Sequence, residues 1–169
     1  MIKLQKSSFN LRVGDQRKSE KKDSGVFNTV FETALRIILL TSSSPDILFS
    51  STRILALDFI NCYAKAFRLA SENLHGNNDF MYGEMAGRRL LVTEAIKRLV
   101  RNGILQVQND CGYRYKITTY GIELSRNFFS TYAQEYCRVA KISAKKYDCK
   151  SDEELIMEIQ SHPGIVLKE

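Results

Sequence analysis

The sequence of 169 residues contains no tryptophan, two prolines and two histidines. Its four cysteines include no pair at CxxC spacing, and with so few histidines to complete a ligand set we expect no zinc site. We interpret the cysteines as reduced thiols of a cytoplasmic protein. No apolar run reaches the roughly 18 residues of a membrane-spanning helix, so we expect no contact with a membrane. The opening stretch MIKLQKSSFNLRVGDQRKSEKK lacks the apolar segment of a secretory signal, and we expect none.

Motifs for catalysis are missing as well. The sequence has no HExxH and no GxxxxGK[ST] loop, and its acidic residues do not cluster as a two-metal site requires. No serine or cysteine nucleophile has a histidine nearby in the chain, and His75 stands alone in the loop-like stretch ENLHGNN. We therefore expect no enzymatic activity, no metal and no cofactor, and we interpret the chain as a binding module.

Charge is distributed unevenly along the chain, whose formal net charge is +6. Residues 1–25 carry seven basic and three acidic side chains, a net charge of +4, and residues 84–119 carry the same numbers. Residues 151–169 carry one basic and five acidic side chains, a net charge of −4. A positive surface attracts phosphate backbones regardless of sequence, although a basic excess of this size is also typical of an ordinary solvated surface.

Apolar spacing, capping signals and turn formers predict the order of the elements, and 44 % hydrophobic residues suffice for a buried core. The expected elements are a helix at 26–41, a helix from Ser50–Ser51 through Phe67, a loop at 71–83, a helix at about 84–102, a β-hairpin at 104–118, a helix from Thr119, a helix at about 130–147 and a short acidic helix after Ser151. This order predicts a mainly α fold with a small β-hairpin: a winged helix-turn-helix with extra C-terminal helices. We expect a basic flexible arm (1–25), a winged-helix domain (26–129) and a C-terminal helical extension (130–169).

The helix at 84–102 has an apolar side and a basic side. In a DNA-reading winged helix, the solvent side of this helix enters the major groove and the hairpin touches the backbone. The basic side offers no Asn, Gln or Ser to read bases, so we expect weak and non-specific binding of double-stranded DNA. The residues predicted to contact phosphates are Lys97, Arg98, Arg101, Arg114 and Lys116. The alternative is an exposed amphipathic face with a Glu94–Arg98 pair at i,i+4 spacing.

Two charged residues fall on apolar helix sides. Asp58 flanks the apolar face of the second predicted helix, and Arg89 falls on the apolar side of the third. Because a buried unpaired charge is costly, we predict that Asp58 and Arg89 form a buried ion pair between these helices. The alternative is that one of them faces a partner protein.

The last two predicted helices carry apolar stripes that a winged-helix core does not require. We predict that these stripes bind a partner protein, with the acidic last helix docking into a groove. The candidate partner-binding residues are Tyr132, Tyr136, Val139, Ile142, Leu155, Ile156 and Ile159. Folding of the last helix back onto its own domain is the competing interpretation.

Three stretches also resemble a known family. LALDFI at 55–60, LHGNNDFMYGEMAGRRLLVTEAIKRLVRNGIL at 74–105 and TYAQEYCRVAKI at 131–142 resemble the middle component of bacterial ABC-three-component systems. The Gly-Glu step at 83–84 and the paired arginines at 88–89 match the family pattern. Gly76 stands where the family has a proline after the histidine.

The resemblance implies a small winged-helix subunit encoded beside an SMC/Rad50-like coiled-coil ATPase and an effector nuclease, as in Lamassu antiphage and antiplasmid defence. It implies a non-catalytic role that bridges the ATPase and the effector and assists DNA sensing. The alternative is a sequence-specific winged-helix transcriptional regulator, which would act as a homodimer on a palindromic site.

Overall fold

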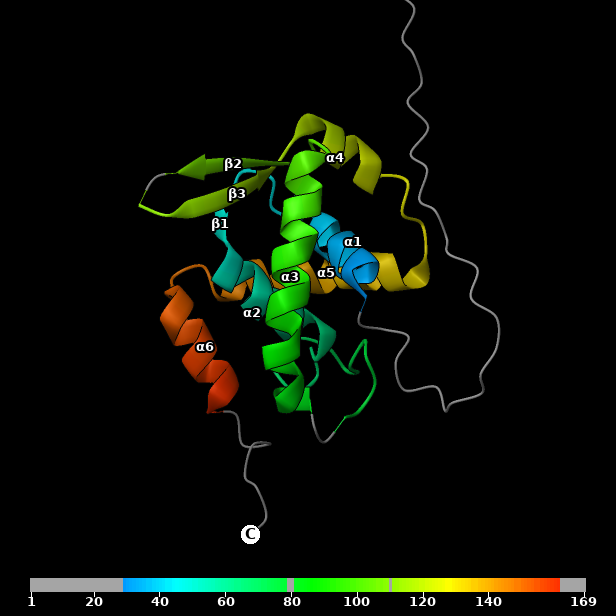
Figure 1. Ribbon diagram of the computed structural model, residues 1–169. Helices are drawn as coiled ribbons and strands as arrows, with labels where there is room; N and C mark the ends of the chain where they lie inside the picture. Colours follow the sequence, from blue (N-terminus) through cyan, green and yellow to red (C-terminus); the bar gives the residue numbers. More distant parts are fainter. Residues whose placement is uncertain (1–28, 79–80, 110, 162–169) are drawn as a thin grey trace, which may run out of the picture.

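The structure is a computed structural model that describes residues 29–78, 81–109 and 111–161 (Figure 1). The predicted basic arm at 1–25 lies outside the described residues. The elements are α1 (Val30–Ser42), β1 (Phe49–Ser50), α2 (Ser51–Cys62), a 3₁₀ turn (Met81–Gly83), α3 (Glu84–Arg101), β2 (Leu105–Asn109), β3 (Tyr113–Ile117), α4 (Thr119–Ser125), α5 (Thr131–Lys146) and α6 (Asp152–Gln160). The chain is thus mainly helical with a small antiparallel sheet, as the sequence predicts. In the described part of the chain, no helix combines the length and the apolar character needed to cross a membrane.

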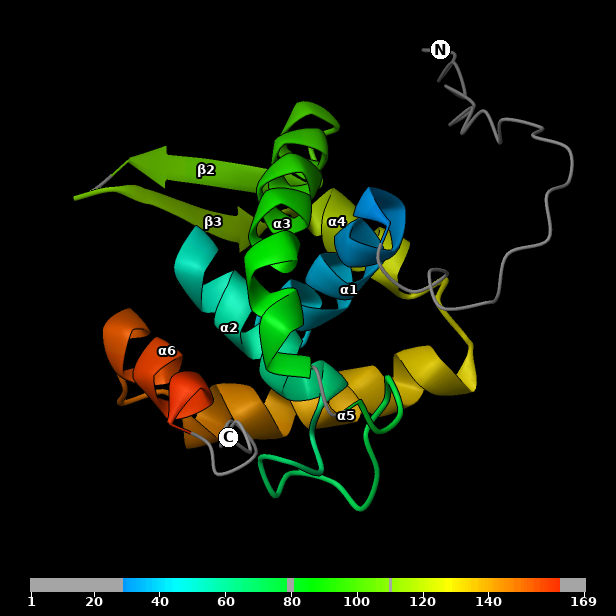
Figure 2. The same ribbon diagram turned by 60° about the horizontal axis from the view of Figure 1, so that its bottom comes forward.

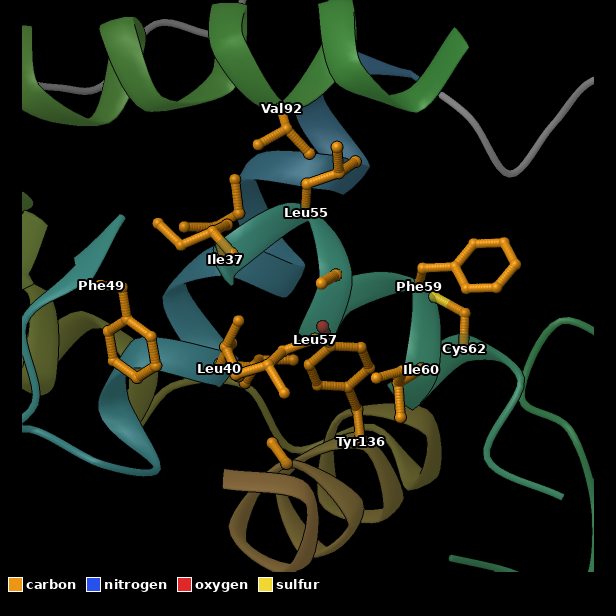
Figure 3. Packing of buried hydrophobic residues seen from close by; sticks show 14 of the residues in the cluster. Ile37, Leu40, Phe49, Leu55, Leu57, Phe59, Ile60, Cys62, Val92 and Tyr136 are labelled. Carbon is orange, nitrogen blue, oxygen red and sulfur yellow. The ribbon is translucent and has the colours of Figure 1, made fainter. Parts of the chain in front are cut away.

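Helix α2 is the centre of the fold. Every residue from Ile54 to Ala64 is buried, and α1, α3, α5 and α6 all contact this helix. Figure 3 shows buried side chains of α2 between α3 and α5. A helix that is buried on all sides can be apolar all round, which explains the run ILALDFINCYA. The sequence predicted only one apolar face for this helix.

The end of α2 differs from the prediction, which continued the helix to Phe67. The helix ends at Cys62, and the backbone hydrogen bonds after Tyr63 no longer follow the i,i+4 spacing of an α-helix. Ala66 N–H donates to the Tyr63 carbonyl, and the Cys62 carbonyl accepts from His75 N–H at 3.2 Å. The loop after α2 is thereby fastened to the end of the helix, and it carries His75 back to the core.

The sheet has the strand order β1-β3-β2, and all its pairings are antiparallel. The hairpin of β2 and β3 lies where the sequence predicts it, whereas the two-residue strand β1 was not predicted. Val107 is directly opposite Tyr115 in the register, and Gln108 is opposite Arg114. Because side chains alternate along strands, the tyrosines lie on one face of the hairpin and the basic residues lie on the other. The alternation of aromatic and basic residues in YRYKIT predicts this separation.

Two glycines fix the junctions of α3, the hairpin and α4. Gly103, at φ +67, ends α3 after Asn102, at the Asn-Gly step that predicts the end of this helix. Gly121 lets the first turn of α4 pass the root of the hairpin, because a Cβ atom there would lie 2.6 Å from the Ile104 carbonyl oxygen and 2.7 Å from Ile117 Cγ1. The hairpin is therefore anchored at its root beside α3 and α4 (Figure 2).

The two C-terminal helices pack onto the same core as the rest. Helix α5 contacts α1 and α2, and α6 contacts α2. Ser151 and Glu154 form the capping box that the sequence predicts at the start of α6. Since α5 and α6 share one apolar cluster with α2, they complete the core of the described chain. The domain boundary predicted between residues 129 and 130 stays a prediction. The helices on its two sides share one hydrophobic core.

Buried charge cluster and candidate binding surfaces

The most concentrated polar chemistry of the described chain surrounds Asp58 of α2. Arg36 of α1 donates from Nε to Oδ1 at 2.7 Å and from Nη2 to Oδ2 at 3.2 Å. Arg88 of α3 donates from Nη1 to Oδ2 at 3.3 Å, and the Tyr136 hydroxyl of α5 donates to Oδ1 at 2.8 Å. One carboxylate thus ties α2 to three other helices, and Figure 3 shows Tyr136 reaching from α5 toward α2.

The carboxylate stays ionised although it is fully buried. Burial alone would raise the pKa of Asp58, but the two guanidinium charges outweigh it and hold the pKa below its usual value. At Cys62, one helical turn further along α2, burial is the dominant effect and raises the thiol pKa to about 11. At neutral pH the groups around Asp58 are therefore one anion, two cations and a protonated thiol.

The predicted pairing of Asp58 with Arg89 is wrong. Arg88 is the arginine of α3 that pairs with Asp58, and its side chain is 2 % exposed, whereas Arg89 is exposed. The two residues lie about 100° apart on α3, so only one of them can point at α2. At about 100° per residue, Arg88 lies at the edge of the apolar side of α3, and a small rotation of that side exchanges the two arginines.

The cluster continues from Arg88 toward the surface. Arg88 Nη2 donates to Glu84 Oε2 at 3.2 Å, and the Tyr63 hydroxyl donates to the same oxygen at 2.8 Å. Partial burial opposes the ionisation of Glu84, but the Tyr63 hydrogen bond and the Arg88 charge lower its pKa. Burial and the carboxylate together raise the pKa of Tyr63 to about 12. The N-terminal turn of α3 is thereby fastened to the end of α2.

His75 joins the cluster from the loop after α2. Its Nδ1 lies 3.2 Å from Arg88 Nη2, and its Nε2 lies 3.0 Å from the Tyr132 hydroxyl of α5. A guanidinium only donates, so Nδ1 accepts, and in the neutral ring Nε2 carries the hydrogen and donates to Tyr132. Burial lowers the pKa of His75 from 6.5 to about 4, and the charges of Arg36 and Arg88 act in the same direction. The ring is therefore neutral at physiological pH.

A cavity of about 400 Å³ opens beside the cluster, between α1 and the start of α5. Arg36, His75 and Tyr132 contribute polar groups to its wall, which is otherwise mostly apolar. The full lining is Glu32, Leu35, Arg36, Leu39, His75, Phe128, Phe129, Ser130, Tyr132 and Ala133. The Phe129 side chain at this cavity is 75 % exposed. The cluster is thus adjacent to a hollow that suits an apolar group.

The five predicted DNA-binding residues do not form one surface. Lys97, Arg98 and Arg101 are exposed on α3, where Arg98 also pairs with Glu94 at 3.2 Å. The two basic residues of the hairpin lie on the face opposite Tyr113 and Tyr115, and these tyrosines line a groove together with α3. Each of them has a carboxylate within 4 Å: Arg114 lies 3.9 Å from Asp152, and Lys116 lies 3.9 Å from Asp46.

Most of the predicted partner-binding residues belong to the core. Tyr136, Val139, Leu155 and Ile159 are buried, so the prediction that these four form a docking surface is wrong. Tyr132 and Ile156 are half-buried, and Ile142 remains exposed. The apolar stripe of α6 covers α2, as the competing interpretation proposed. The reason is that α2 is buried on every side, and α5 and α6 cover the sides that α1 and α3 leave open.

Sequence reasoning missed Arg36, Arg88, His75 and Tyr136 as partners in the cluster. Arg36 lies within the run ALRIILL, where a charged residue inside a buried stretch is a signal that it has a partner. The hydroxyl of Tyr136 has no comparable signal, because tyrosine is common on apolar helix faces.

Neither the comparison with curated proteins nor the comparison with solved structures gave a match. A family model does match, and it spans residues 26–169, which includes all the elements described above. That family is described as Middle Component 2 of the ABC-three component (ABC-3C) system. It agrees with the resemblance found in the Leu-Asp-Phe helix, the Leu-His loop and the paired arginines. This chain therefore belongs to the Middle Component 2 family of ABC-three component systems.

Proposed function

We propose that this chain is a non-catalytic, cytoplasmic subunit of a bacterial defence complex of the Lamassu type. It binds an SMC/Rad50-like coiled-coil ATPase and an effector nuclease, and it adds weak, non-specific contacts to double-stranded DNA. The observation that carries the proposal is the family match over residues 26–169, because a middle component works in a system of several components.

The buried cluster supports the non-catalytic part of the proposal. Asp58 accepts hydrogen bonds from three side chains, and the buried Cys62 thiol has its pKa raised to about 11. The His75 ring is hydrogen-bonded to Arg88 through one nitrogen and to the Tyr132 hydroxyl through the other. These groups are occupied with one another, which suits a role in holding four helices together rather than in proton transfer or nucleophilic attack.

The arrangement of the elements supports a winged-helix type of subunit. The order α1–β1–α2–α3–β2–β3 and the strand order β1-β3-β2 are typical of such folds, in which the helix before the hairpin is the exposed recognition helix. The exposed residues of α3 include four cations, Arg89, Lys97, Arg98 and Arg101, and no Asn or Gln for a bidentate contact to adenine. This composition favours contact with phosphates over base readout.

A matched pair of double variants tests the DNA contact. We expect K97Q/R101Q to weaken binding to random duplex DNA and to lower the salt slope by about 1–2 units, at about 0.9 per phosphate contact. We expect R114Q/K116Q to change binding much less, because these side chains lie beside Asp152 and Asp46. Fluorescence anisotropy over a series of salt concentrations measures both. Equal effects of the two pairs would contradict the assignment of DNA contacts to α3.

Co-expression with the neighbouring genes tests the assembly. We expect the tagged full chain to retain a long coiled-coil ATPase and the effector through gel filtration at physiological salt. Selection from random duplexes is the companion measurement, and we expect no enriched site. A chain that elutes alone as a dimer and enriches one palindrome would instead establish the regulator alternative.

A further inference from the structure

The outer side of β2 is an open edge of the sheet. Among the described residues, β2 pairs only with β3, and Figures 1 and 2 show no element beyond it. Its sequence LQVQN contains neither a charge nor a proline, the two devices with which proteins usually protect an edge strand. The edge is thus open to pairing with another strand.

The register shows which backbone groups point outward. Thr118 N–H donates to the Ile104 carbonyl, and hydrogen-bonded pairs alternate along an antiparallel ladder. The backbone groups of Gln106 and Gln108 therefore face β3, whereas those of Val107 face away from it. An added strand would bond to Val107, and the residue directly opposite would share its face.

That face borders a groove of about 280 Å³ between the hairpin and α3. Val107, Tyr113 and Tyr115 line it from the hairpin, and Ile96 and Val100 line it from α3. Val107 is 45 % exposed and Tyr113 is 66 % exposed. A residue opposite Val107 in an added strand would place its side chain at this groove, where an apolar or aromatic group fits.

The rim of the groove is positive. Lys97 and Arg101 line it from α3, both are exposed, and neither lies within 4 Å of a carboxylate of the described residues. The neighbouring Arg98 differs, because it is paired with Glu94. Two unpaired cations beside an apolar groove complement a segment that carries an apolar residue flanked by acidic ones.

We propose that the β2 edge and this groove together bind an extended acidic segment of a partner protein, which adds a strand to the sheet and places one apolar side chain at Tyr113 and Tyr115. This inference rests on the proposed function, since it names the kind of partner segment that a protein-binding subunit would take. The binding mode is strand addition, in which backbone bonds supply affinity and a pocket supplies selectivity.

Selection from phage-displayed random peptides of about twelve residues, longer than an ordinary strand, tests the proposal with the full chain. We expect enriched peptides to combine acidic residues with one aromatic or β-branched residue. Val107→Pro removes the outward N–H and leaves the ladder to β3 intact, because proline is tolerated at such edge positions. We expect it to weaken the selected peptides about tenfold, as the loss of a backbone hydrogen bond and the bulk of the ring predict.

Val107→Thr is the matched control, since it keeps the backbone N–H and nearly the same shape, and we expect a change of less than about threefold. K97E/R101E should weaken the peptides more at low salt than at high salt. Thermal melts monitored by circular dichroism verify that each variant folds. Peptides that bind Val107→Pro as tightly as the unaltered chain would overturn the proposal.

Single-stranded nucleic acid is the rival occupant of the groove, and oligothymidylate is the probe for it. If oligothymidylate shifts the amide resonances of Val107 and Tyr113 while no peptide is enriched, the groove binds single strands and the proposal is wrong. Failure of peptide selection alongside normal recovery of the ATPase complex overturns only this inference. Failure to recover any complex with the unaltered chain overturns the proposed function.

Discussion

Helix α2 contains two fully buried polar side chains less than one turn apart, and their surroundings are opposite. Asp58 accepts hydrogen bonds from two arginines and a tyrosine, whereas the side-chain amide of Asn61 has no hydrogen-bond partner within the described residues. The first residue joins four helices. The second leaves polar atoms unsatisfied in an apolar setting, which costs stability. Burial alone therefore does not show that a polar side chain stabilises the fold. Its effect on stability depends on whether neighbouring helices supply hydrogen-bond partners.

Asp58→Ala should have the largest effect on the free energy of unfolding. Removal of the carboxylate leaves Arg36 and Arg88 buried without their shared anion, a change that costs about 3–5 kcal/mol. Urea denaturation measures the loss. Arg89→Ala is the control on the neighbouring helix, and we expect a change below about 0.5 kcal/mol because this arginine is exposed. A small effect at Asp58 would remove the contrast with Asn61.

The neutral His75 ring makes the stability of the folded chain depend on pH. Its pKa is about 4 in the folded chain against 6.5 for the free side chain, so the unfolded chain binds more protons between these values. Stability is then full above pH 6.5 and falls by up to about 3 kcal/mol as the pH decreases toward 4. The range from 6.5 to 4.5 isolates this effect, because Glu84 and Asp58 lose their contributions at lower pH. His75→Gln should flatten the decrease, and an unchanged profile would contradict the assignment.

Asn61→Leu should stabilise the chain by about 1–2 kcal/mol. Leucine has a similar volume and removes two polar atoms that have no hydrogen bond. Thermal unfolding with the unaltered chain in parallel measures the gain. Asn61→Asp is the informative counterpart, since an unpaired carboxylate at this position should destabilise strongly. If the leucine variant is less stable, Asn61 has a partner in solution and the two positions are alike.

Tyr136→Phe should lower the stability by about 1–2 kcal/mol, a change no larger than the gain expected for Asn61→Leu. The ring still fills its place in the core, but Asp58 loses the hydroxyl that donates at 2.8 Å. Tyr120→Phe is the control, because Tyr120 is 54 % exposed on α4. In a double-mutant cycle, Tyr136→Phe should cost much less when Asp58 is already alanine. Additive effects would show that the hydroxyl contributes nothing through the carboxylate.

Local signals in the sequence were enough for most of the elements. The Asn102-Gly103 step, the Ser151 capping box and the alternation of YRYKIT each depend on neighbouring residues only, and each predicted its feature correctly. The partners of Asp58 were not accessible in this way. Arg36 and Tyr136 are 22 and 78 residues from it in the chain, and helical wheels do not place one helix against another.

The same limit explains the error about the docking stripes. The apolar residues of α5 and α6 were predicted to be spare because the central position of α2 was not evident. A helix that is buried all round needs more cover than α1 and α3 provide. Leu155 and Ile159 supply part of that cover. The open β2 edge was equally hidden, because the strand order β1-β3-β2 depends on the pairing of Phe49 with Tyr115.

The contact between the start of α2 and α6 has a consequence for protein synthesis. The Ser50 hydroxyl that caps α2 donates to Asp152, 102 residues later, and the Arg53 guanidinium donates to the Lys150 carbonyl at 2.8 Å. A ribosome that adds about 5–20 residues per second needs about 5–20 s to make that span. During this interval the apolar surface of α2 that α6 later covers stays open in the nascent chain. The last helix therefore sets the earliest moment at which the central helix is sealed, and a pause in translation near residue 150 lengthens the time during which a nascent chain can aggregate.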